Sequence, residues 1–166
     1  MTGGDRAASS ERRAARLAAV QALYQMELTG TDAEEMALEF SDHRFGKEVE
    51  LSPAGPPDEA FFGTIVRGVP KHQVEIDRSI ARCLSSDWKL ERIDSVLRAV
   101  LRAGAFELID RKDVPAKVVI DEYVDIAHAF FEGDEPGFVN AALDKLAHRK
   151  RAPEFGETPP DDELQF

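Results

Sequence analysis

The chain of 166 residues has little of several features that define large classes of proteins. A single cysteine, Cys83, excludes an intramolecular disulfide and is typical of a reducing compartment. Because Cys83 has apolar neighbours in an expected helix, we expect a buried side chain rather than a reactive thiol. No apolar run reaches the roughly 18–20 residues that span a bilayer, and residues 1–6 lack the apolar stretch of a secretory signal. These absences predict a cytoplasmic protein.

Patterns typical of catalytic and metal sites are also missing from the sequence. No His-x-x-x-His or Cys-x-x-Cys pair could begin a metal site. Neither a glycine-rich phosphate loop nor a Gly-x-Ser-x-Gly elbow is present. The clusters of carboxylates fit solvated helix faces and caps better than acid–base chemistry. We therefore expect no enzymatic activity, no cofactor and no metal.

Positive charge is scarce overall but locally concentrated. The formal net charge is −11, so bulk charge cannot hold nucleic acid and any such binding needs a local basic patch. Residues 6–16 hold four arginines against one glutamate, and residues 144–151 hold four bases against one aspartate. The stretch 152–166 that follows holds five acids and no base.

Apolar residues recur with helical spacing along most of the chain, and alternating β patterns are absent. One apolar face runs through 93–108, and a wider one through 119–131 indicates burial on more than one side. Asp113 is expected to cap the helix after the 110–115 turn, with Pro115 in its first turn, and Trp88 to anchor the helix before it. Further helices are expected over about 11–28, 32–45, 58–69, 71–84 and 134–146.

The predicted fold is all-α, with about seven helices in one domain over residues 10–150. Two packed subdomains are expected, at about 10–84 and 85–150. Residues 1–9 are small and polar, and residues 151–166, the acidic tail, are rich in acids, proline and glycine. We expect both end segments to be disordered, and the tail to be dispensable for folding.

Three blocks of sequence carry a family signature. The first is RRxARxxAVQALYQ at residues 12–25, the second covers 87–108, and the third combines VPxKVxIxExVxIA at 114–127 with FVNxxLDK at 138–145. Together, and in this order, they resemble the NusB family of transcription antitermination factors. The resemblance covers residues 12–149 with few gaps and implies a helical, non-catalytic, RNA-binding protein.

The resemblance also implies partners. A factor of this kind binds single-stranded boxA RNA on nascent ribosomal RNA together with the ribosomal protein NusE. It acts with other Nus factors and RNA polymerase in a larger complex, where it promotes processive rRNA transcription. Sequence-specific RNA recognition usually targets unpaired strands by stacking and arginine contacts, which a local patch can supply.

Five residues are candidates for RNA binding. Arg12, Arg13 and Arg16 share one side of the first expected helix, where cations near the N-terminus cost stability and are more easily explained by a ligand. The resemblance places residues 130–138 near RNA, and so adds Asp134 and Phe138. Asp134 is also expected to cap a helix, and the periodicity favours a core position for Phe138 over a stacking platform.

The sequence departs from the family within that stretch, and three alternatives remain open. Glu135-Pro136-Gly137 stands where a Ser-His-Lys type triplet is expected, which removes a cation and adds an anion. The arginine cluster could pair with an acidic protein in a pure interaction module. The chain could also form a homodimer that covers the RNA face. Finally, the helical fold resembles the N-terminal domain of some rRNA cytosine methyltransferases, although the glycine-rich methyl-donor motif is absent.

Overall fold

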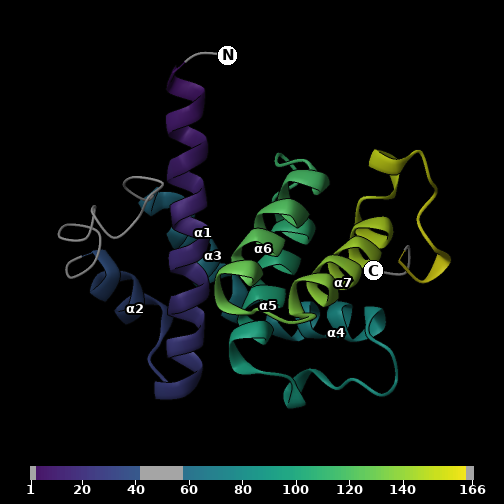
Figure 1. Ribbon diagram of the computed structural model, residues 1–166, viewed down its shortest axis with the longest axis horizontal. Helices are drawn as coiled ribbons and strands as arrows, with labels where there is room; N and C mark the ends of the chain where they lie inside the picture. The colour runs from purple at the N-terminus through teal and green to yellow at the C-terminus, as the bar shows by residue number, and fades with distance from the viewer. Residues whose placement is uncertain (1–2, 42–57, 164–166) are drawn as a thin grey trace. The chain divides into compact units, whose positions relative to one another are not determined.

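A computed structural model describes residues 3–41 and 58–163 of the chain, and residues 1–2, 42–57 and 164–166 lie outside the described part. The described residues form helices and no strand, which confirms the all-α prediction (Figure 1). The end of the helix expected through about residue 45 falls outside the described residues. The elements are α1 (Gly3–Thr29), α2 (Ala33–Glu39), α3 (Glu59–Lys71), α4 (Gln73–Cys83), η3 (Leu90–Arg92), α5 (Ser95–Asp110), α6 (Ala116–Phe130), α7 (Glu135–Lys150), η4 (Ala152–Phe155) and η5 (Asp161–Glu163).

The chain divides into two compact units, Met1–Lys71 and His72–Phe166. The sequence places the boundary near residue 84, but α4 packs on α5 and α7 and so belongs to the second unit. The boundary therefore follows Pro70, which lies in the last turn of α3. No helix in the described ranges is long and apolar enough to cross a membrane.

In the first unit, α3 packs against both α1 and α2. Asp32 caps α2, since its Oδ1 accepts a hydrogen bond from the Glu35 backbone N–H at 2.8 Å. Helix α1 begins at Gly3, so residues 3–9 are helical and the expectation of disorder is wrong for them. The physical reason is that this stretch holds no proline and contains the strong helix formers Ala7 and Ala8.

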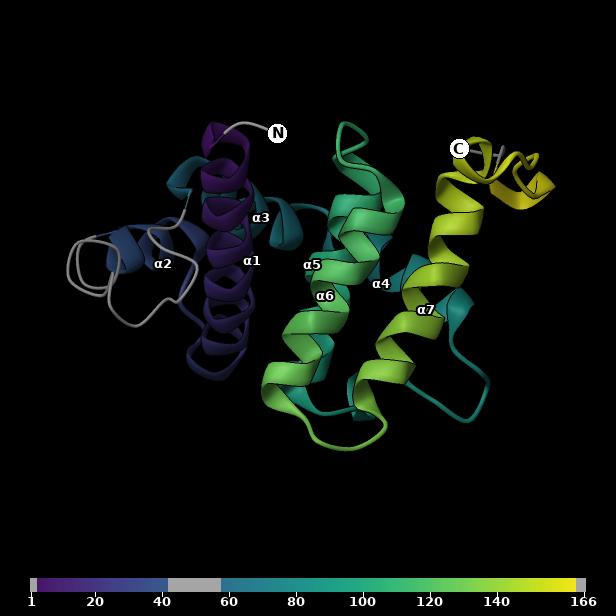
Figure 2. The ribbon, with the colours of Figure 1, turned by 45° about the horizontal axis from the view of Figure 1, so that its top comes forward.

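In the second unit, α5 packs against α4, α6 and α7, while α6 and α7 pack against each other (Figure 2). Gly104 lets α5 approach α7 closely, because an added Cβ would lie 2.8 Å from Leu143 Cδ1. The fully buried Tyr123 hydroxyl donates to the buried Glu107 carboxylate at 2.5 Å. This pairing satisfies a polar group that would otherwise be costly to bury.

The connection from α5 to α6 is held by residues far along the chain. The Glu154 carboxylate accepts from the Ala116 backbone N–H at 2.9 Å, and so caps α6 from the acidic tail. The sequence predicts that Asp113 caps this helix, but the structure differs. Both carboxylate oxygens of Asp113 accept from the Arg111 guanidinium at 2.9 Å. Pro115 occupies the N-cap position itself. A local capping pattern is thus replaced by a tertiary contact.

The acidic tail is ordered over the described residues up to 163, which corrects the expectation of a disordered segment. Ala152 is fully buried, and the Phe155 ring stacks on His148 with centroids 4.0 Å apart. Asp162 and Glu163 form ion pairs with Arg149 near the end of α7. Composition alone suggests a solvated tail. In the structure these carboxylates pair with cations, and the Phe155 ring stacks on His148 of the same unit.

Candidate nucleic-acid interface

The three arginines of the predicted cluster differ in exposure. They lie on α1, where Arg13 is exposed, Arg12 is half-buried and Arg16 is only 3% exposed. The guanidinium carbons of Arg12 and Arg16 lie 4.7 Å and 4.9 Å from the centroid of the buried Phe61 ring of α3. Such cation–π contacts hold a guanidinium in place while its edge can still donate hydrogen bonds.

The helix dipole does not explain why the arginines lie where they do. The penalty for a cation near a helix N-terminus falls off within the first turn, and α1 begins at Gly3, well before Arg12. The sequence predicts that the cluster opposes the helix dipole, and this prediction is wrong because the helix begins earlier. The contact with Phe61 could not be read from the sequence, because the pairing of α1 with α3 is tertiary.

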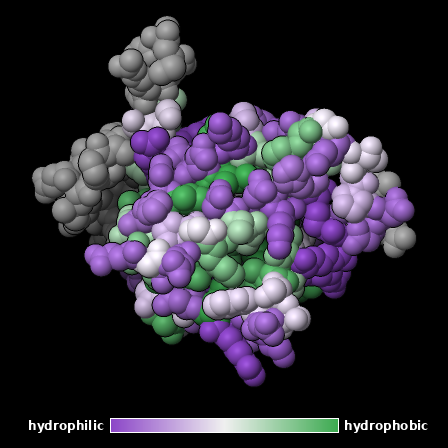
Figure 3. All heavy atoms as spheres, turned by 45° about the vertical axis from the view of Figure 1, so that its right-hand side comes forward, coloured by the Kyte–Doolittle hydropathy of each residue, from purple (hydrophilic) through white to green (hydrophobic). Residues whose placement is uncertain are grey.

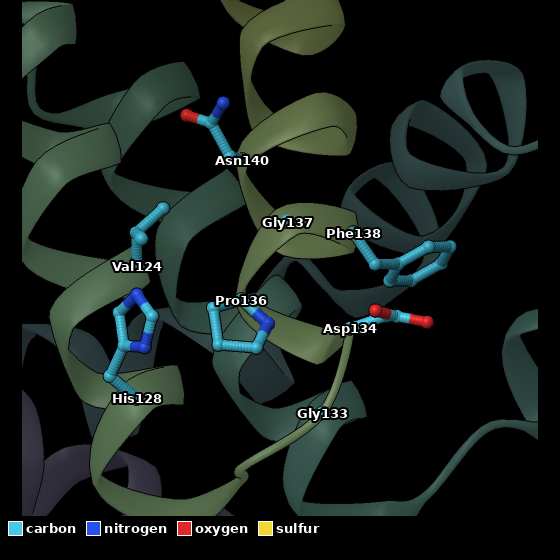
Figure 4. Close-up of a pocket in the computed structure, with 8 residues that line it drawn as sticks. All are labelled: Val124, His128, Gly133, Asp134, Pro136, Gly137, Phe138 and Asn140. Atoms are coloured by element: carbon cyan, nitrogen blue, oxygen red, sulfur yellow. The ribbon is translucent and has the colours of Figure 1, made fainter.

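A second group of candidate residues surrounds the start of α7. The last turns of α6 and the residues at the beginning of α7 border an open pocket of about 710 Å³ (Figure 4). In the close-up, Val124 and His128 of α6 lie on one side of Pro136, and Asp134 and Phe138 project on the other. The lining residues are Val124, His128, Gly133, Asp134, Pro136, Gly137, Phe138 and Asn140.

Asp134 occupies the N-cap position of α7, but its side chain makes no capping hydrogen bond. Its backbone has helical dihedral angles (φ −85°, ψ −3°) instead of the extended conformation that lets an N-cap side chain reach back. Only its main-chain carbonyl serves the helix, by accepting from the Phe138 N–H at 3.0 Å. The sequence predicts a capping side chain; in the structure this exposed carboxylate lies beside the pocket instead.

Phe138 is half-buried, and its ring pairs with that of Trp88, with centroids 5.3 Å apart and planes tilted by 47°. The sequence predicts that Trp88 anchors the helix that follows it. In the structure this side chain is 53% exposed, and its ring pairs with Phe138 of α7. The pair presents aromatic surface next to Asp134. The sequence alone does not identify Trp88 as a site residue. The available signal was its place in a polar turn, directly after Ser85-Ser86-Asp87.

The Glu135-Pro136-Gly137 triplet forms the first turn of α7. Pro136 is buried near the N-terminus of the helix, where a missing N–H costs little. Among the described residues, Glu135 Oε2 is a buried side-chain oxygen without a hydrogen-bond partner. A buried acceptor of this kind is unfavourable until a donor reaches it. The triplet thus places a buried acceptor without a partner in the first turn of α7.

The surface around these elements mixes polar and apolar residues. Figure 3 shows hydrophilic residues across the face that α7 and the tail bring forward, around a smaller hydrophobic area. Within the described ranges, no group of three or more His, Cys, Asp or Glu side chains could hold a metal ion. The residues around the pocket can supply stacking, hydrogen bonds and charge.

Comparisons with known proteins agree with this architecture. The NusB family model matches residues 13–148. The chain is 54% identical over 140 residues to transcription antitermination protein NusB of Caulobacter vibrioides, with 84% of this chain and 94% of that protein covered. It is 55% identical over 148 residues to the protein of that name from Bradyrhizobium sp. (strain BTAi1), covering 89% and 88%.

Solved structures show the same similarity. Thermotoga maritima NusB has a TM-score of 0.68 and 28% identity, covering 93% of this chain and 97% of that chain. A chain in the crystal structure of a plectonemic RNA supercoil has a TM-score of 0.68 and 26% identity, covering 81% and 91%. The resemblance carried by the three sequence blocks is thereby confirmed, and the chain belongs to the NusB family.

Proposed function

We propose that this NusB-type protein is a non-catalytic transcription antitermination factor that binds single-stranded boxA-type RNA jointly with the ribosomal protein NusE. One observation carries the RNA-binding part most directly. A partly exposed aromatic pair, Trp88 and Phe138, stands beside the uncapped Asp134 carboxylate at the start of α7. Membership of the NusB family supports the role in antitermination, as do curated relatives that carry that name.

The aromatic pair supplies a platform for unpaired bases. Base–aromatic stacking contributes about 1–3 kcal/mol per base and tolerates any base. Selectivity then needs hydrogen bonds to base edges, which single strands expose. The exposed Asp134 carboxylate can accept from base amino groups and from a 2′-hydroxyl. The pocket thus combines stacking with a hydrogen-bond acceptor at its edge.

The arginine cluster supplies phosphate contacts in the first unit. Arg13 is the exposed member and is assigned the direct contact. Arg12 and Arg16 are held over Phe61, so they position the cluster, and the half-buried Arg12 can also donate from its outer edge. All three arginines thus contribute to the proposed RNA site, Arg13 mainly by direct contact and Arg16 by positioning.

A basic partner accounts for how so acidic a chain holds RNA. With a net charge of −11, the protein repels phosphates at long range, and its local contacts are few. NusE would add cationic surface to a joint RNA site, and the pair would join other Nus factors and RNA polymerase on nascent rRNA. Such a role places the protein in the bacterial cytoplasm. The similarity to a chain from the crystal structure of an RNA supercoil also supports RNA as the ligand.

The test compares two substitutions of Phe138 with each other. Phe138→Leu keeps an apolar side chain but removes the ring, and Phe138→Tyr keeps the ring. Loss of stacking on one base is expected to weaken binding of a fluorescent boxA-type RNA by about 5- to 150-fold in F138L, which corresponds to about 1–3 kcal/mol. F138Y is expected to stay close to the original affinity. Equal affinities of F138L and the unsubstituted protein for RNA would contradict the proposed site.

A further inference from the structure

The end of α7 and the acidic tail form a compact ion-pair cluster. The Glu163 carboxylate lies 2.9 Å from Arg149 Nε, 2.7 Å from Lys150 Nζ and 3.5 Å from an Arg82 guanidinium nitrogen of α4. Asp162 accepts from Arg149 Nη2 at 2.5 Å. The Glu163 side chain is only 5% exposed, so the tail covers these cations instead of only lying near them.

The electrostatics of the cluster favour the charged forms on both sides. The hydrogen bond from Arg149 holds the pKa of Asp162 below its usual range. Burial alone would raise the pKa of Glu163, but Lys150 and Arg149 together lower it. Carboxylates seated on guanidinium and ammonium groups make the same contacts that phosphate oxygens would make. The tail therefore occupies a surface suited to oxyanions.

The cations continue the line of the aromatic platform along α7. Lys145 and Arg149 follow Phe138 by close to two and three whole helical turns, so the three side chains share one face. Arg149 lies about 16 Å beyond Phe138 along the helix axis. Both cations act electrostatically on the buried Cys83 thiol of α4, which places them on the α4 side of α7. A single strand stacked at Phe138 could thus run along this face.

We propose that Lys145, Arg149, Lys150 and Arg82 form a phosphate track that extends the RNA site along α7, with Asp162 and Glu163 of the tail as intramolecular competitors at its far end. This inference rests on the proposed RNA-binding function and names a regulation of the same site. RNA is favoured over an acidic peptide because the track begins at a ring pair suited to base stacking.

Competition from within the chain has a measurable signature. A tethered competitor acts at an effective concentration that can reach the millimolar range, so it weakens RNA binding without any added ligand. When RNA binds, the cations exchange the tail carboxylates for RNA phosphates. This exchange releases fewer counterions than the binding of RNA to an open cationic surface. Neutralising the tail should therefore raise affinity and also steepen its dependence on salt.

The experiment compares D162N/E163Q with the charge-matched control D121N/D161N. Asp121 lies exposed on α6, and Asp161 is exposed in the same turn as the competing pair. D162N/E163Q is expected to bind a boxA-type RNA about 5- to 10-fold tighter at low salt. Its log–log salt slope should be steeper by about 2, the value for three phosphate contacts on a single strand. The control should change affinity less than about twofold, and adding K145A/R149A to D162N/E163Q should remove the gain.

A second measurement uses the unsubstituted protein, so it does not depend on how a variant folds. The backbone amide resonances of Glu157, Thr158 and residues 161–163 should move toward random-coil positions when RNA is added. If RNA binds while those resonances stay in place, or if D162N/E163Q matches its control, the tail is not a competitor and the proposed function still stands. If none of the proteins binds RNA at any salt concentration, the proposed function fails and this inference fails with it.

Discussion

Arg151 ends the basic stretch of α7, but its environment is unlike that of its neighbours. The residue is 3% exposed, and its guanidinium donates to the backbone carbonyls of Glu107, Leu108, Arg111 and Val114 at 2.6–3.0 Å. It also pairs with Glu154 at 2.6 Å. Carbonyls at the end of a helix lack partners within that helix, so a planar guanidinium with five donors can satisfy several at once. Arg151 thus ties the end of α5 and the following turn to the end of α7.

Replacing Arg151 is therefore expected to destabilise the fold strongly. Arg151→Ala removes a donor from four backbone carbonyls and breaks the ion pair with Glu154, which should lower the free energy of unfolding by about 3–5 kcal/mol. Lys112→Ala, at an exposed cation, serves as the control and should stay within about 0.5 kcal/mol. Urea denaturation of both variants measures the difference. A loss of under about 1 kcal/mol in R151A would show that water replaces the guanidinium without cost.

His148 gives the tail contact a pH dependence. The hydrogen bond with Glu157 raises the pKa of His148, and the charges of Glu157 and Asp144 act in the same direction. A raised pKa in the folded state means that this stabilisation is complete below the ordinary histidine pKa, near about 6.5, and is lost as the pH rises through the raised value.

The expected result is a higher pKa for His148 in the unsubstituted protein than in Glu157→Gln. Titration of the imidazole resonances by NMR measures both values, with the exposed His72 as the internal reference. Identical titration curves for His148 in the two proteins would mean that Glu157 does not hold the ring in solution.

Among the elements, the packing of α5 on α7 depends on the absence of a side chain. A Cβ at Gly104 would lie 2.8 Å from Leu143 Cδ1 and 3.3 Å from Tyr123 Cδ2, and both neighbours are buried. An added methyl group must therefore displace core side chains. At Gly137 in α7, by contrast, an added Cβ meets nothing within 4 Å.

This contrast predicts opposite effects from the same substitution. Gly104→Ala should destabilise the protein by about 1–3 kcal/mol through overpacking. Gly137→Ala should stabilise it by about 0.5–1 kcal/mol, because alanine is the better helix former. Thermal unfolding of both variants tests the pair. Stabilisation by both substitutions would show that Leu143 moves aside freely.

The helices could be predicted from the sequence, but the contacts between distant parts of the chain could not. The periodic apolar faces of α5 and α6 are long, so their helices could be predicted from spacing alone. The cap of α6 could not be predicted, because Glu154 lies 38 residues from Ala116 along the chain. The same limit applies to the tail, whose acidic composition predicts disorder while the cations that hold it lie on α7 and α4.

In the candidate site, too, some features could be predicted from the sequence and others could not. Arg12, Arg13 and Arg16 could be grouped by spacing on one helix, but their unequal exposure depends on Phe61 of α3. Phe138 could be named from the family signature, whereas its partner Trp88 comes from a loop that no periodic pattern describes. Residue identity and local spacing could thus be predicted, and tertiary neighbours could not.

For the whole molecule, charge is the deciding quantity. The chain carries 32 acids against 21 lysines and arginines, and part of its basic surface is paired with its own tail. We therefore expect this chain alone to bind RNA weakly, since phosphate contacts contribute much of the affinity. We consequently expect RNA binding to be cooperative with a basic partner.

Titrating boxA-type RNA and NusE, each in the presence and absence of the other, tests this central claim most directly. Linkage requires that NusE tighten RNA binding by the same factor by which RNA tightens NusE binding. We expect both factors to be about tenfold or more, as for coupling near 1.4 kcal/mol or above. If this protein alone binds the RNA as tightly as the pair does, the joint site is wrong and its own surface suffices.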